Sequence, residues 1–533
     1  MKKFNTTAVC LPRKHYMVDI SERVAKIKRM VEAGDYFTIN RARQYGKTTT
    51  LYALKKALID EYRVLNLDFQ SIENGSFANG GEFSKAFARI VLDAAEYYGL
   101  TLPDTVREQF TELAGRETSE VKMDDLFRIF RFWLKVEVQP VVMIIDEVDS
   151  ASNNQVFLDF LAQLRDGYIR RETDGGPAFQ SVILAGVTDI KHLKSKIREE
   201  TASKENSPWN IAADFDIDMS LSEEGIEGML AEYEIDHQTG MNTGEIAKLL
   251  REYTNGYPFL VSRLCQLMDE RLVPEKFSSL SEAWTRQGFE EAVKRILTED
   301  NTLFQSLSSK LNNFPELRAS LRSLLMEGEK LTWNTDQKEI VQMAMYGFIR
   351  NDKSEVRIDN RIFETRLYYL FLSDEELKSN VFSREGDLER NIFVEDGKLN
   401  VRLILERFIE AYHQICGPLE EPERFREKDG RELFLLYLRP IINGTGNFYI
   451  EAQTRDQKRT DVIIDYLGKQ YIIELKIWRG ERYNAEGERQ IRDYLDYFGL
   501  DTGYMLSFNF NKKKEIGVRR VEIDGKILFE GTV

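Results

Sequence analysis

Cysteine is scarce in this chain. Three cysteines occur among 533 residues, at Cys10, Cys265 and Cys416, and no two of them form a CxxC pair. Such wide spacing argues against a disulfide framework and against a zinc knuckle, and it is typical of a protein that is kept reduced in the cytosol. We therefore expect a cytoplasmic protein that folds without disulfide bonds.

Long apolar runs and an excess of positive charge are also lacking. No stretch approaches the roughly 18–20 apolar residues that cross a bilayer, and the first 20 residues have no apolar centre of a signal peptide. We therefore expect no membrane partner. Lys and Arg number 74 against 89 Asp and Glu, which gives a formal net charge of -15. This balance excludes a generally basic coat for nucleic acid but leaves a local basic groove open.

The residues that are present suit several ordinary globular domains. Hydrophobic residues make up 42% and charged residues 31% of the chain, and a length of about 150 residues per domain suggests three or four domains. Strands alternate with helices over residues 1–220, which predicts an α/β core with a doubly wound parallel sheet. The expected strands are 36–40, 64–69, 141–145 and 181–185, with a further short one at 210–213.

The pattern changes along the rest of the chain. Residues 221–305 are helical throughout by periodicity, which predicts a helical lid. Over 306–375, helices precede two short extended pieces around Asp352-Lys353, an order typical of a winged-helix module. Residues 376–400 are charged and suit a linker, and 401–533 are expected to form a separate mixed α/β domain.

One loop in the core carries residues suited to binding phosphate. The segment RARQYGKTTT lies between an expected strand and a helix, and Gly46-Lys47-Thr48 match the end of the pattern GxxxxGK(S/T). Backbone N–H groups at a helix N-terminus hold phosphates, Lys47 would reach the β- and γ-phosphates, and the Thr48 hydroxyl would bind Mg²⁺. We expect Thr49, the next residue along the chain, to contribute to nucleotide binding as well. The first glycine of the pattern is replaced by Arg41, and the tripeptide alone would also fit a chance loop that caps a helix.

A second feature about 100 residues downstream favours the nucleotide interpretation. The segment VVMIIDEVDS is an apolar strand that ends in Asp146-Glu147, as in a Walker B strand. Asp146 would hold the hydration shell of Mg²⁺, and Glu147 would orient and polarise the attacking water. The alternative is a charged pair that only solvates the end of a strand.

Residues of about 10–370 resemble the AAA-like ATPases of the STAND-related group of bacteria and archaea. The matching segments are FTINRARQYGKTTTL, VVMIIDEVDS, SVILAGVTD, TNGYPFLVSRL and the tail GFIRND to EVRIDNRIFETRL. In that group arginines often replace the first glycine of the loop, as Arg41 does here. The resemblance implies ATP and Mg²⁺ as cofactors.

The same resemblance implies roles for further residues. It makes Thr188 a polar sensor of the γ-phosphate, places Tyr257-Pro258 near the nucleotide base, and makes Arg263 a candidate sensor arginine. The alternative for Thr188 is an ordinary threonine at a strand end. No arginine finger can be assigned, and four arginines stay open for that role: Arg165, Arg170, Arg171 and Arg198.

The C-terminal region carries a second group of chemically useful residues. In RTDVIIDYLGKQYIIELKIW, two expected strands flank a turn, with Asp461 at the start of the first. Glu474 and Lys476 lie two residues apart on the second, and hence on one face. Asp461 and Glu474 could bind Mg²⁺ or Mn²⁺, and the metal could activate water for attack on a phosphate.

This layout resembles the PD-(D/E)XK nuclease superfamily over residues of about 400–533. The resemblance assigns Glu432 to the upstream acid of that family, and it matches Gln490 and Tyr494 to a Q-x-x-x-Y helix. Thr460 stands where a proline is usual. The alternatives are an amphipathic hairpin with a solvated salt bridge, and a nuclease fold kept only for binding.

These features together predict an ATPase coupled to a metal-dependent nuclease that acts on DNA, in defence or in mobile-element biology. A first alternative is a signalling switch, in which the ATPase senses a partner protein and the C-terminal domain only docks. A second is a chaperone-like or transposition-type ATPase whose winged helix contacts DNA. The oligomeric state and the upstream signal stay open, and a homo-oligomer is one option.

Overall fold

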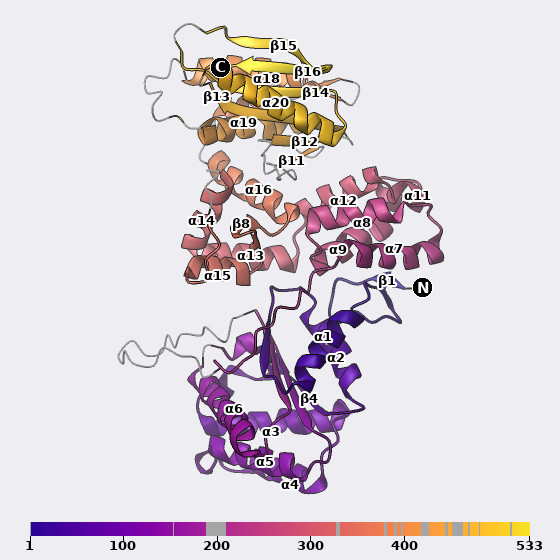
Figure 1. Cartoon of the computed structure of the whole chain (residues 1–533), viewed down its shortest axis with the longest axis vertical. Helices are drawn as coiled ribbons and strands as arrows, with labels where there is room; N and C mark the ends of the chain where they lie inside the picture. The colour runs from indigo at the N-terminus through magenta and orange to yellow at the C-terminus, as the bar shows by residue number, and fades with distance from the viewer. Residues whose placement is uncertain are drawn as a thin grey trace. The chain divides into compact units, whose positions relative to one another are not determined.

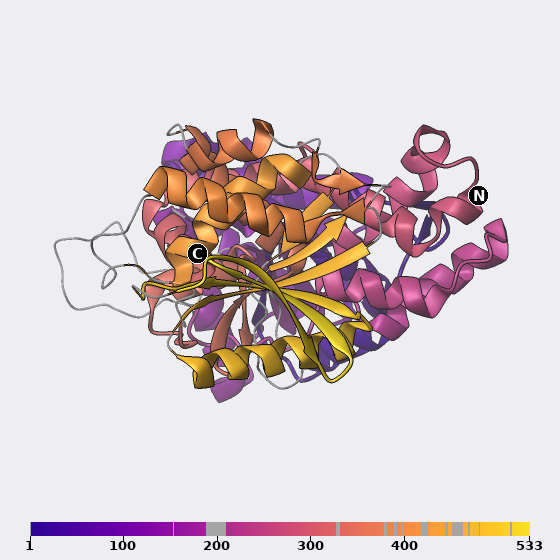
Figure 2. The same ribbon diagram turned by 90° about the horizontal axis from the view of Figure 1, so that it is seen from above.

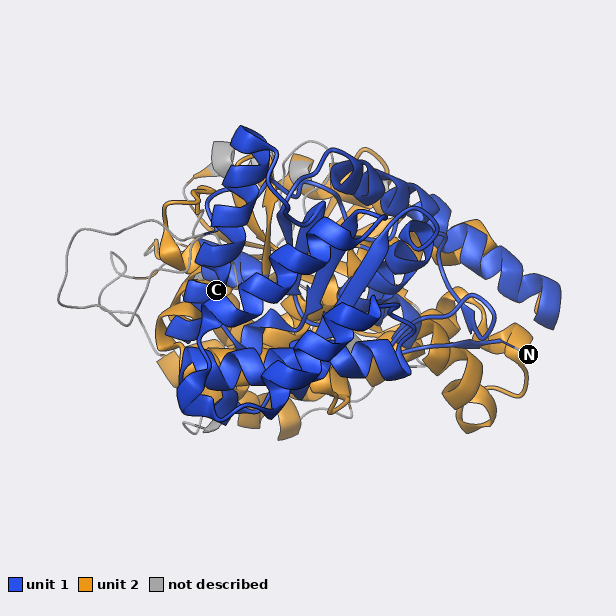
Figure 3. Cartoon of the chain, turned by 90° about the horizontal axis from the view of Figure 1, so that it is seen from below, with its two compact units in different colours: residues 1–237, 256–263, 341–348 blue, residues 238–255, 264–340, 349–533 orange. Residues whose placement is uncertain are grey.

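The structure is a computed structural model that divides into two compact units (Figure 3). The first unit comprises residues 1–237, 256–263 and 341–348, and the second comprises 238–255, 264–340 and 349–533. The residues that the structure describes are 2–152, 154–187, 209–326, 331–377, 381–388, 392–395, 398–416, 425, 427–442, 446–449, 462–466, 469–478, 480–511 and 514–533.

A four-stranded parallel sheet forms the centre of the first unit (Figure 1). The strand order is β3-β6-β5-β4, with β3 (Phe37–Asn40), β4 (Arg63–Asp68), β5 (Val141–Asp146) and β6 (Ser181–Gly186). Each strand lies within one residue of its predicted bounds. The further strand expected at 210–213 is reduced to a single parallel bridge between Ala213 and Phe37 beside β3.

Helices cover both faces of this sheet because both faces of its strands are apolar. Successive side chains of a strand point to opposite faces. Val142 and Ile144 therefore pack with helices α1 (Ser21–Glu32) and α2 (Lys47–Leu58). Met143 and Ile145 pack on the other face. The helices that contribute to that second core are α3 (Gly80–Tyr97), α4 (Asp104–Gly115), α5 (Met123–Val136) and α6 (Gln155–Asp174).

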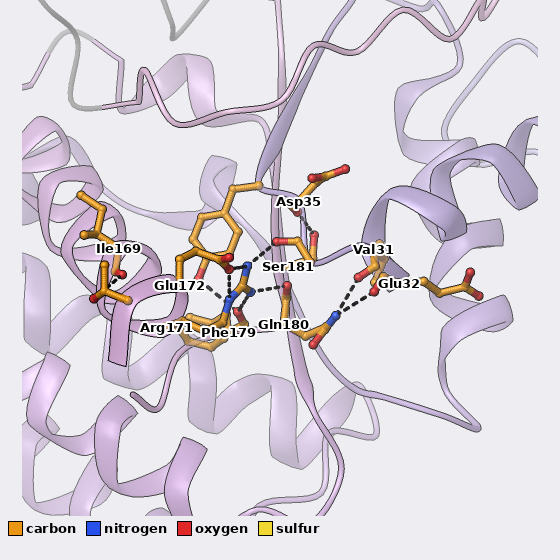
Figure 4. Close-up of polar contacts among 12 residues, drawn as sticks. Val31, Glu32, Asp35, Ile169, Arg171, Glu172, Phe179, Gln180 and Ser181 are labelled. Carbon is orange, nitrogen blue, oxygen red and sulfur yellow. Dashed lines mark hydrogen bonds and ion pairs between the residues drawn. The ribbon is translucent and has the colours of Figure 1, made fainter. Parts of the chain in front are cut away.

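A network of hydrogen bonds closes the edge of the sheet where β3 and β6 begin (Figure 4). The Arg171 guanidinium donates to the carbonyl oxygens of Phe179 and Gln180, at 2.8 Å each, and to that of Gly34 at 2.6 Å. The Ser181 hydroxyl donates to the Asp35 carbonyl at 2.5 Å. These bonds fix α6 to the segments that enter both strands. Arg171, one of the candidate finger arginines, is thus engaged at the edge opposite to the carboxyl ends of the strands.

The first unit also contains short elements and part of the helical region. They are β1 (Lys3–Phe4), β2 (His15–Tyr16), α7 (Glu223–His237) and the first residues of α9 (Pro258–Gln266). The second unit begins with a helical part made of α8 (Thr243–Thr254), α10 (Leu272–Glu275), α11 (Leu280–Ala283), α12 (Arg286–Thr298), α13 (Thr302–Asn313) and α14 (Pro315–Met326).

The predicted pair of extended pieces forms a β-hairpin in the second unit. Helix α15 (Lys338–Met345) leads to strands β7 (Ile349–Asp352) and β8 (Glu355–Ile358), which pair antiparallel. The turn lies at Lys353 and Ser354, whose φ angles are 51° and 69°. Helix α16 (Arg361–Leu377) follows.

A six-stranded mixed sheet forms the C-terminal part of the second unit. Its order is β11-β12-β13-β14-β16-β15, and its strands are Gly446–Tyr449, Val462–Tyr466, Lys469–Ile477, Thr502–Phe508, Lys526–Thr532 and Gly517–Ile523 in that order. Helix α20 (Glu481–Phe498) covers one face, and α18 (Val401–Cys416) and α19 (Glu427–Ile442) cover the other (Figure 2). The small elements α17 (Val381–Leu388), β9 (Val394–Glu395) and β10 (Lys398–Leu399) precede α18. Within the described ranges, no helix is both long and apolar enough to span a bilayer.

Candidate functional site

The predicted phosphate loop lies at the carboxyl end of β3, directly before α2. Gly46 has a φ of 83° and precedes Lys47, the first residue of the helix. Glycine is favoured there because this left-handed conformation costs other residues free energy. The loop therefore presents the N-terminus of a twelve-residue helix at the edge where the parallel strands end, a place suited to an anion.

Lys47 is buried inside this loop. Its Nζ donates hydrogen bonds to the carbonyl oxygens of Arg41 and Ala42, at 3.0 and 3.1 Å. Burial lowers the pKa of Lys47, and the charges of Glu147 and Asp149 oppose that shift. Within the described part of the chain the hydrogen bonds of the ammonium group go to main-chain oxygens, and a phosphate would offer it stronger, charged acceptors.

The two predicted nucleotide motifs meet through a direct hydrogen bond. The Thr48 hydroxyl donates to Oδ2 of Asp146 at 2.8 Å, and the backbone N–H of Glu147 donates to Oδ1 of Asp146 at 2.9 Å. Burial raises the pKa of Asp146, and the Thr48 hydrogen bond opposes this. Glu147 has a φ of 55°, and its pKa is raised by burial and then by the Asp146 charge.

The Thr48 and Asp146 oxygens fit a magnesium ion. Adjacent ligands of an octahedral Mg²⁺ lie about 2.9 Å apart, because each ligand is about 2.0–2.1 Å from the ion. The separation of 2.8 Å is close to that edge length, and it is also the usual length of an O–H···O hydrogen bond. Among the described residues no cluster of three His, Cys, Asp or Glu side chains could hold a metal alone. Mg²⁺ would therefore depend here on phosphate and water oxygens for its other ligands, as is usual for that ion.

The arginine that replaces the first glycine of the motif anchors the loop. The Arg41 guanidinium donates to the carbonyl oxygens of Asn40 and Ile217, each at 2.8 Å, and lies 5.3 Å from the ring centre of Phe215. This side chain joins the start of the loop to residues 215–217. The sequence shows that arginine stands in place of the first glycine. It does not reveal the partners of Arg41, because both hydrogen-bond acceptors are backbone carbonyls.

Two distant segments of the first unit pack on the phosphate loop. The Tyr257 hydroxyl donates to the Arg43 carbonyl, and the Tyr257 ring lies edge-on to Tyr45 with centroids 4.7 Å apart. Gly347 lies against Ala42, because a Cβ built on Gly347 would stand 2.7 Å from the Ala42 Cβ. Tyr257, which the resemblance placed near the nucleotide base, thus contacts the phosphate loop itself.

The remaining residues of the predicted nucleotide site are placed as follows. Thr49 accepts a hydrogen bond from the Cys10 backbone N–H at 3.1 Å through its hydroxyl. Arg263 is half-buried on α9. Thr188 lies outside the described residues. A residue that motif reasoning missed is Asp149, whose Oδ2 accepts the backbone N–H of Val187 at 2.7 Å and so connects the segment after β5 to the end of β6.

Among the other candidate finger arginines, Arg170 pairs with Asp166 at 2.7 Å on the surface of α6. Arg198 lies outside the described residues. The structure therefore shows local partners for Arg170 and Arg171, and a finger arginine stays unassigned.

The C-terminal sheet brings Glu474 and Lys476 together on one face of β13. The Glu474 Oε1 atom lies 3.4 Å from the Lys476 Nζ, and the two residues are 2% and 8% exposed. Their neighbour Ile472 belongs to the core formed with α20. On α20, a Cβ at Gly487 would approach the Lys476 Cε to 3.0 Å, so glycine leaves space for the lysine beneath the helix.

The other predicted members of this site have different surroundings. Asp461 lies outside the described residues. Glu432 is on α19 and pairs with Arg322 of α14 at 3.1 Å. Tyr494 of α20 is buried in the core beside Ile472. Gln490 lies one turn before Tyr494 on the same helix.

Comparison with known proteins yields distant structural likenesses. The Walker-type ATPase PABY2304 of Pyrococcus abyssi is 13% identical, with 68% of this chain and 99% of that chain covered and a TM-score of 0.46. Cdc6p from Pyrobaculum aerophilum is 14% identical, with 70% and 98% covered and a TM-score of 0.35. A mutant RuvB of Thermotoga maritima is 11% identical, with 64% and 92% covered and a TM-score of 0.32. No curated protein matches the chain.

The sequence itself gives the firmer assignment. A family model described as "AAA-like domain" matches residues 9–370, which is most of the chain and includes the phosphate loop, β5 and β6. The α/β fold with its central parallel sheet agrees with this match. The chain belongs to the AAA-like domain family.

Proposed function

We propose that this protein binds ATP with Mg²⁺ at the phosphate loop and hydrolyses it. The observation that carries the proposal is the 2.8 Å contact between Thr48 and Asp146, which joins the loop to the end of β5. In this proposal Gly46 and the N-terminus of α2 hold the phosphates, Lys47 pairs with the β- and γ-phosphates, and Thr48 and Asp146 face the metal.

Hydrolysis in this proposal depends on Glu147. Its carboxylate follows Asp146 directly and is half-buried, so it can orient a water toward the γ-phosphate. Thr188 is proposed to sense that phosphate and Arg263 to assist; both roles come from the sequence resemblance. Mg²⁺ supplies charge neutralisation on the phosphate oxygens when bound.

Substitutions at the loop test this function. Lys47→Ala should weaken ATP binding at least tenfold, because it removes the charge that pairs with the phosphates. Glu147→Gln should keep ATP binding but lower the turnover rate at least a hundredfold, as expected when a general base is lost. Lys56→Ala on the same helix is the matched control, because Lys56 is exposed and lies over the Tyr52 ring. Unchanged hydrolysis in Lys47→Ala would reject the assignment.

We further propose that the C-terminal domain is a metal-dependent nuclease coupled to the ATPase and acting on DNA. The buried Glu474–Lys476 pair supports this, because a carboxylate beside an ammonium group on one strand face can serve a metal and a phosphate. Asp461 enters as the second carboxylate on the sequence pattern alone. Mg²⁺ or Mn²⁺ would be held by Asp461 and Glu474 and would activate water.

A plasmid-cleavage assay with Mg²⁺ or Mn²⁺, with and without ATP, tests this second proposal. Cleavage should be lost in Asp461→Ala, Glu474→Ala and Lys476→Ala. It should persist in Asp524→Ala, which removes an exposed carboxylate of the turn between β15 and β16 that pairs with Arg492 of α20. Absence of cutting by the wild type beside intact ATP hydrolysis would favour the alternative, an ATP-dependent switch whose C-terminal domain only binds nucleic acid or protein.

A further inference from the structure

A short segment, residues 253–257, contacts the phosphate loop at one end and the C-terminal sheet at the other. Helix α8 ends at Thr254 and α9 begins at Pro258, so only three residues separate them. Asn255 and Gly256 have φ angles of 50° and 71°, which make a tight left-handed turn. Three residues span at most about 10 Å, so such a connection has little slack. The two helix ends therefore cannot move far apart.

One end of this segment is attached to the phosphate loop. The Tyr257 hydroxyl donates to the Arg43 carbonyl, and its ring contacts Tyr45. The Lys47 ammonium group donates to the Arg41 and Ala42 carbonyls, and a phosphate would compete with these carbonyls for it or take its third N–H. Nucleotide would therefore enter directly beside the main chain to which Tyr257 is bonded.

The other end is attached to the C-terminal sheet inside the second unit. The hydroxyl of Tyr253, in the last turn of α8, donates to Oδ2 of Asp465 on β12 at 2.9 Å. Both residues are buried, at 8% and 6% exposure. The Tyr253 ring is held from two sides, by the guanidinium of Arg361 at 5.4 Å and by Phe289 edge-on at 5.1 Å. A buried hydrogen bond of this kind is stronger than one exposed to water, and breaking it is costly.

Strand β12 leads directly to the proposed nuclease residues. It pairs antiparallel with β13, in a register that sets Asp465 opposite Gln470 and Val462 opposite Ile473. Glu474 and Lys476 follow Ile473 on β13. A shift of β12 along or across this ladder would therefore move the strand that carries the acid–lysine pair.

We propose that residues 253–257 are a relay through which nucleotide binding at the phosphate loop alters strands β12 and β13. The relay rests on the proposed ATP binding, but it needs neither ATP hydrolysis nor DNA cleavage. Tyr257 is its contact with the nucleotide loop, and Tyr253 is its contact with the sheet. This assigns the link between the two proposed activities to two tyrosine hydroxyls.

Amide hydrogen exchange of the full chain tests the relay. A non-hydrolysable ATP analogue with Mg²⁺ should change exchange across residues 462–466 and 469–477 of the wild type about fivefold or more, the range of ordinary allosteric coupling. The change should be lost in Tyr253→Phe and in Tyr257→Phe, which remove one hydroxyl each. Tyr368→Phe is the matched control, because the Tyr368 hydroxyl also makes a buried hydrogen bond, to the Leu325 carbonyl at 2.9 Å, away from the segment.

Direct measurement of analogue binding separates the possible failures. If the wild type does not bind the analogue, the proposed ATP function fails and the relay fails with it. If it binds but the exchange of β12 and β13 does not respond, or if Tyr253→Phe and Tyr257→Phe respond as Tyr368→Phe does, the relay is wrong while ATP binding stands. Circular dichroism shows whether each variant folds, and a response that persists in whichever tyrosine variant folds overturns the relay.

Discussion

The contact between two residues of the proposed nucleotide site could be predicted because each belongs to a motif. Thr48 and Asp146 are 98 positions apart, yet each belongs to a pattern that implies contact with the same ion, and they meet at 2.8 Å. The partners of side chains that donate hydrogen bonds to main-chain oxygens could not be predicted in this way. Arg41 and Arg171 bind backbone carbonyls, and such acceptors are present at every position of the sequence.

Arg171 offers a test of that structural role. Arg171→Lys should lower the free energy of unfolding by about 2–3 kcal/mol, because a lysine cannot reproduce the planar fork that binds three carbonyls. Chemical denaturation of the full chain would measure the change. Arg170→Lys is the control: its side chain is 60% exposed and pairs only with Asp166, so the expected effect is under about 0.5 kcal/mol. Equal effects of the two substitutions would contradict the role.

At the scale of elements, the four strands of the first sheet were predictable. Strands β5 and β6 are buried at every position, and β3 and β4 are mostly apolar segments that alternate with helices. The segment 210–213 forms one bridge and no more, since its pairing with Phe37 at the edge of the sheet is not continued. The pairing of β13 with β14 was not predictable. Residues 478–501 intervene, and a parallel register has no local signature in the sequence.

Helix α20 gives a test at this scale. Gly487→Ala should raise helix stability by up to about 1 kcal/mol, and the new Cβ should displace Lys476, whose Cε would lie 3.0 Å away. We therefore expect metal-dependent cleavage to fall at least tenfold with little or no loss of thermal stability. In Gly228→Ala on α7, where a Cβ meets nothing within 4 Å, stability should rise without any change in cleavage. Cleavage that survives in Gly487→Ala would show that the position of Lys476 is not critical.

On the scale of the whole molecule, the compact units do not follow the chain in simple order. Residues 256–263 and 341–348 belong to the first unit although most of their neighbours in sequence belong to the second. Hydrophobic periodicity reports elements but carries no information on which distant segments contact each other, so this interleaving could not be predicted. The finer division of the chain into a core, lid, winged helix, linker and C-terminal domain stays a prediction.

A buried carboxyl group on helix α12, Glu290, makes the stability of the second unit depend on pH. Burial, followed by the charge of Asp465, raises the pKa of Glu290 to about 7 from an ordinary value of 4.5, although Arg286 and Lys294 oppose this and Glu291 adds to it. The folded chain therefore binds more protons here than the unfolded chain between about pH 4.5 and 7. The stabilising contribution is complete below pH 4.5 and is lost as the pH rises to about 7.

Glu290→Gln should remove this dependence. Relative to that variant, the wild type should lose on the order of 2 kcal/mol of stability between pH 4.5 and 8, measured by urea unfolding at several pH values. Asp465→Asn should reduce this loss of stability between pH 4.5 and 8, because it removes the negative charge that is the second cause of the raised Glu290 pKa. Glu406→Gln on α18 controls for removal of a carboxylate elsewhere in the second unit, where Glu406 pairs with Arg402 at 2.9 Å. A difference in stability between wild type and Glu290→Gln that is the same at pH 4.5 and pH 8 would show that the pKa of Glu290 is not raised in the folded chain.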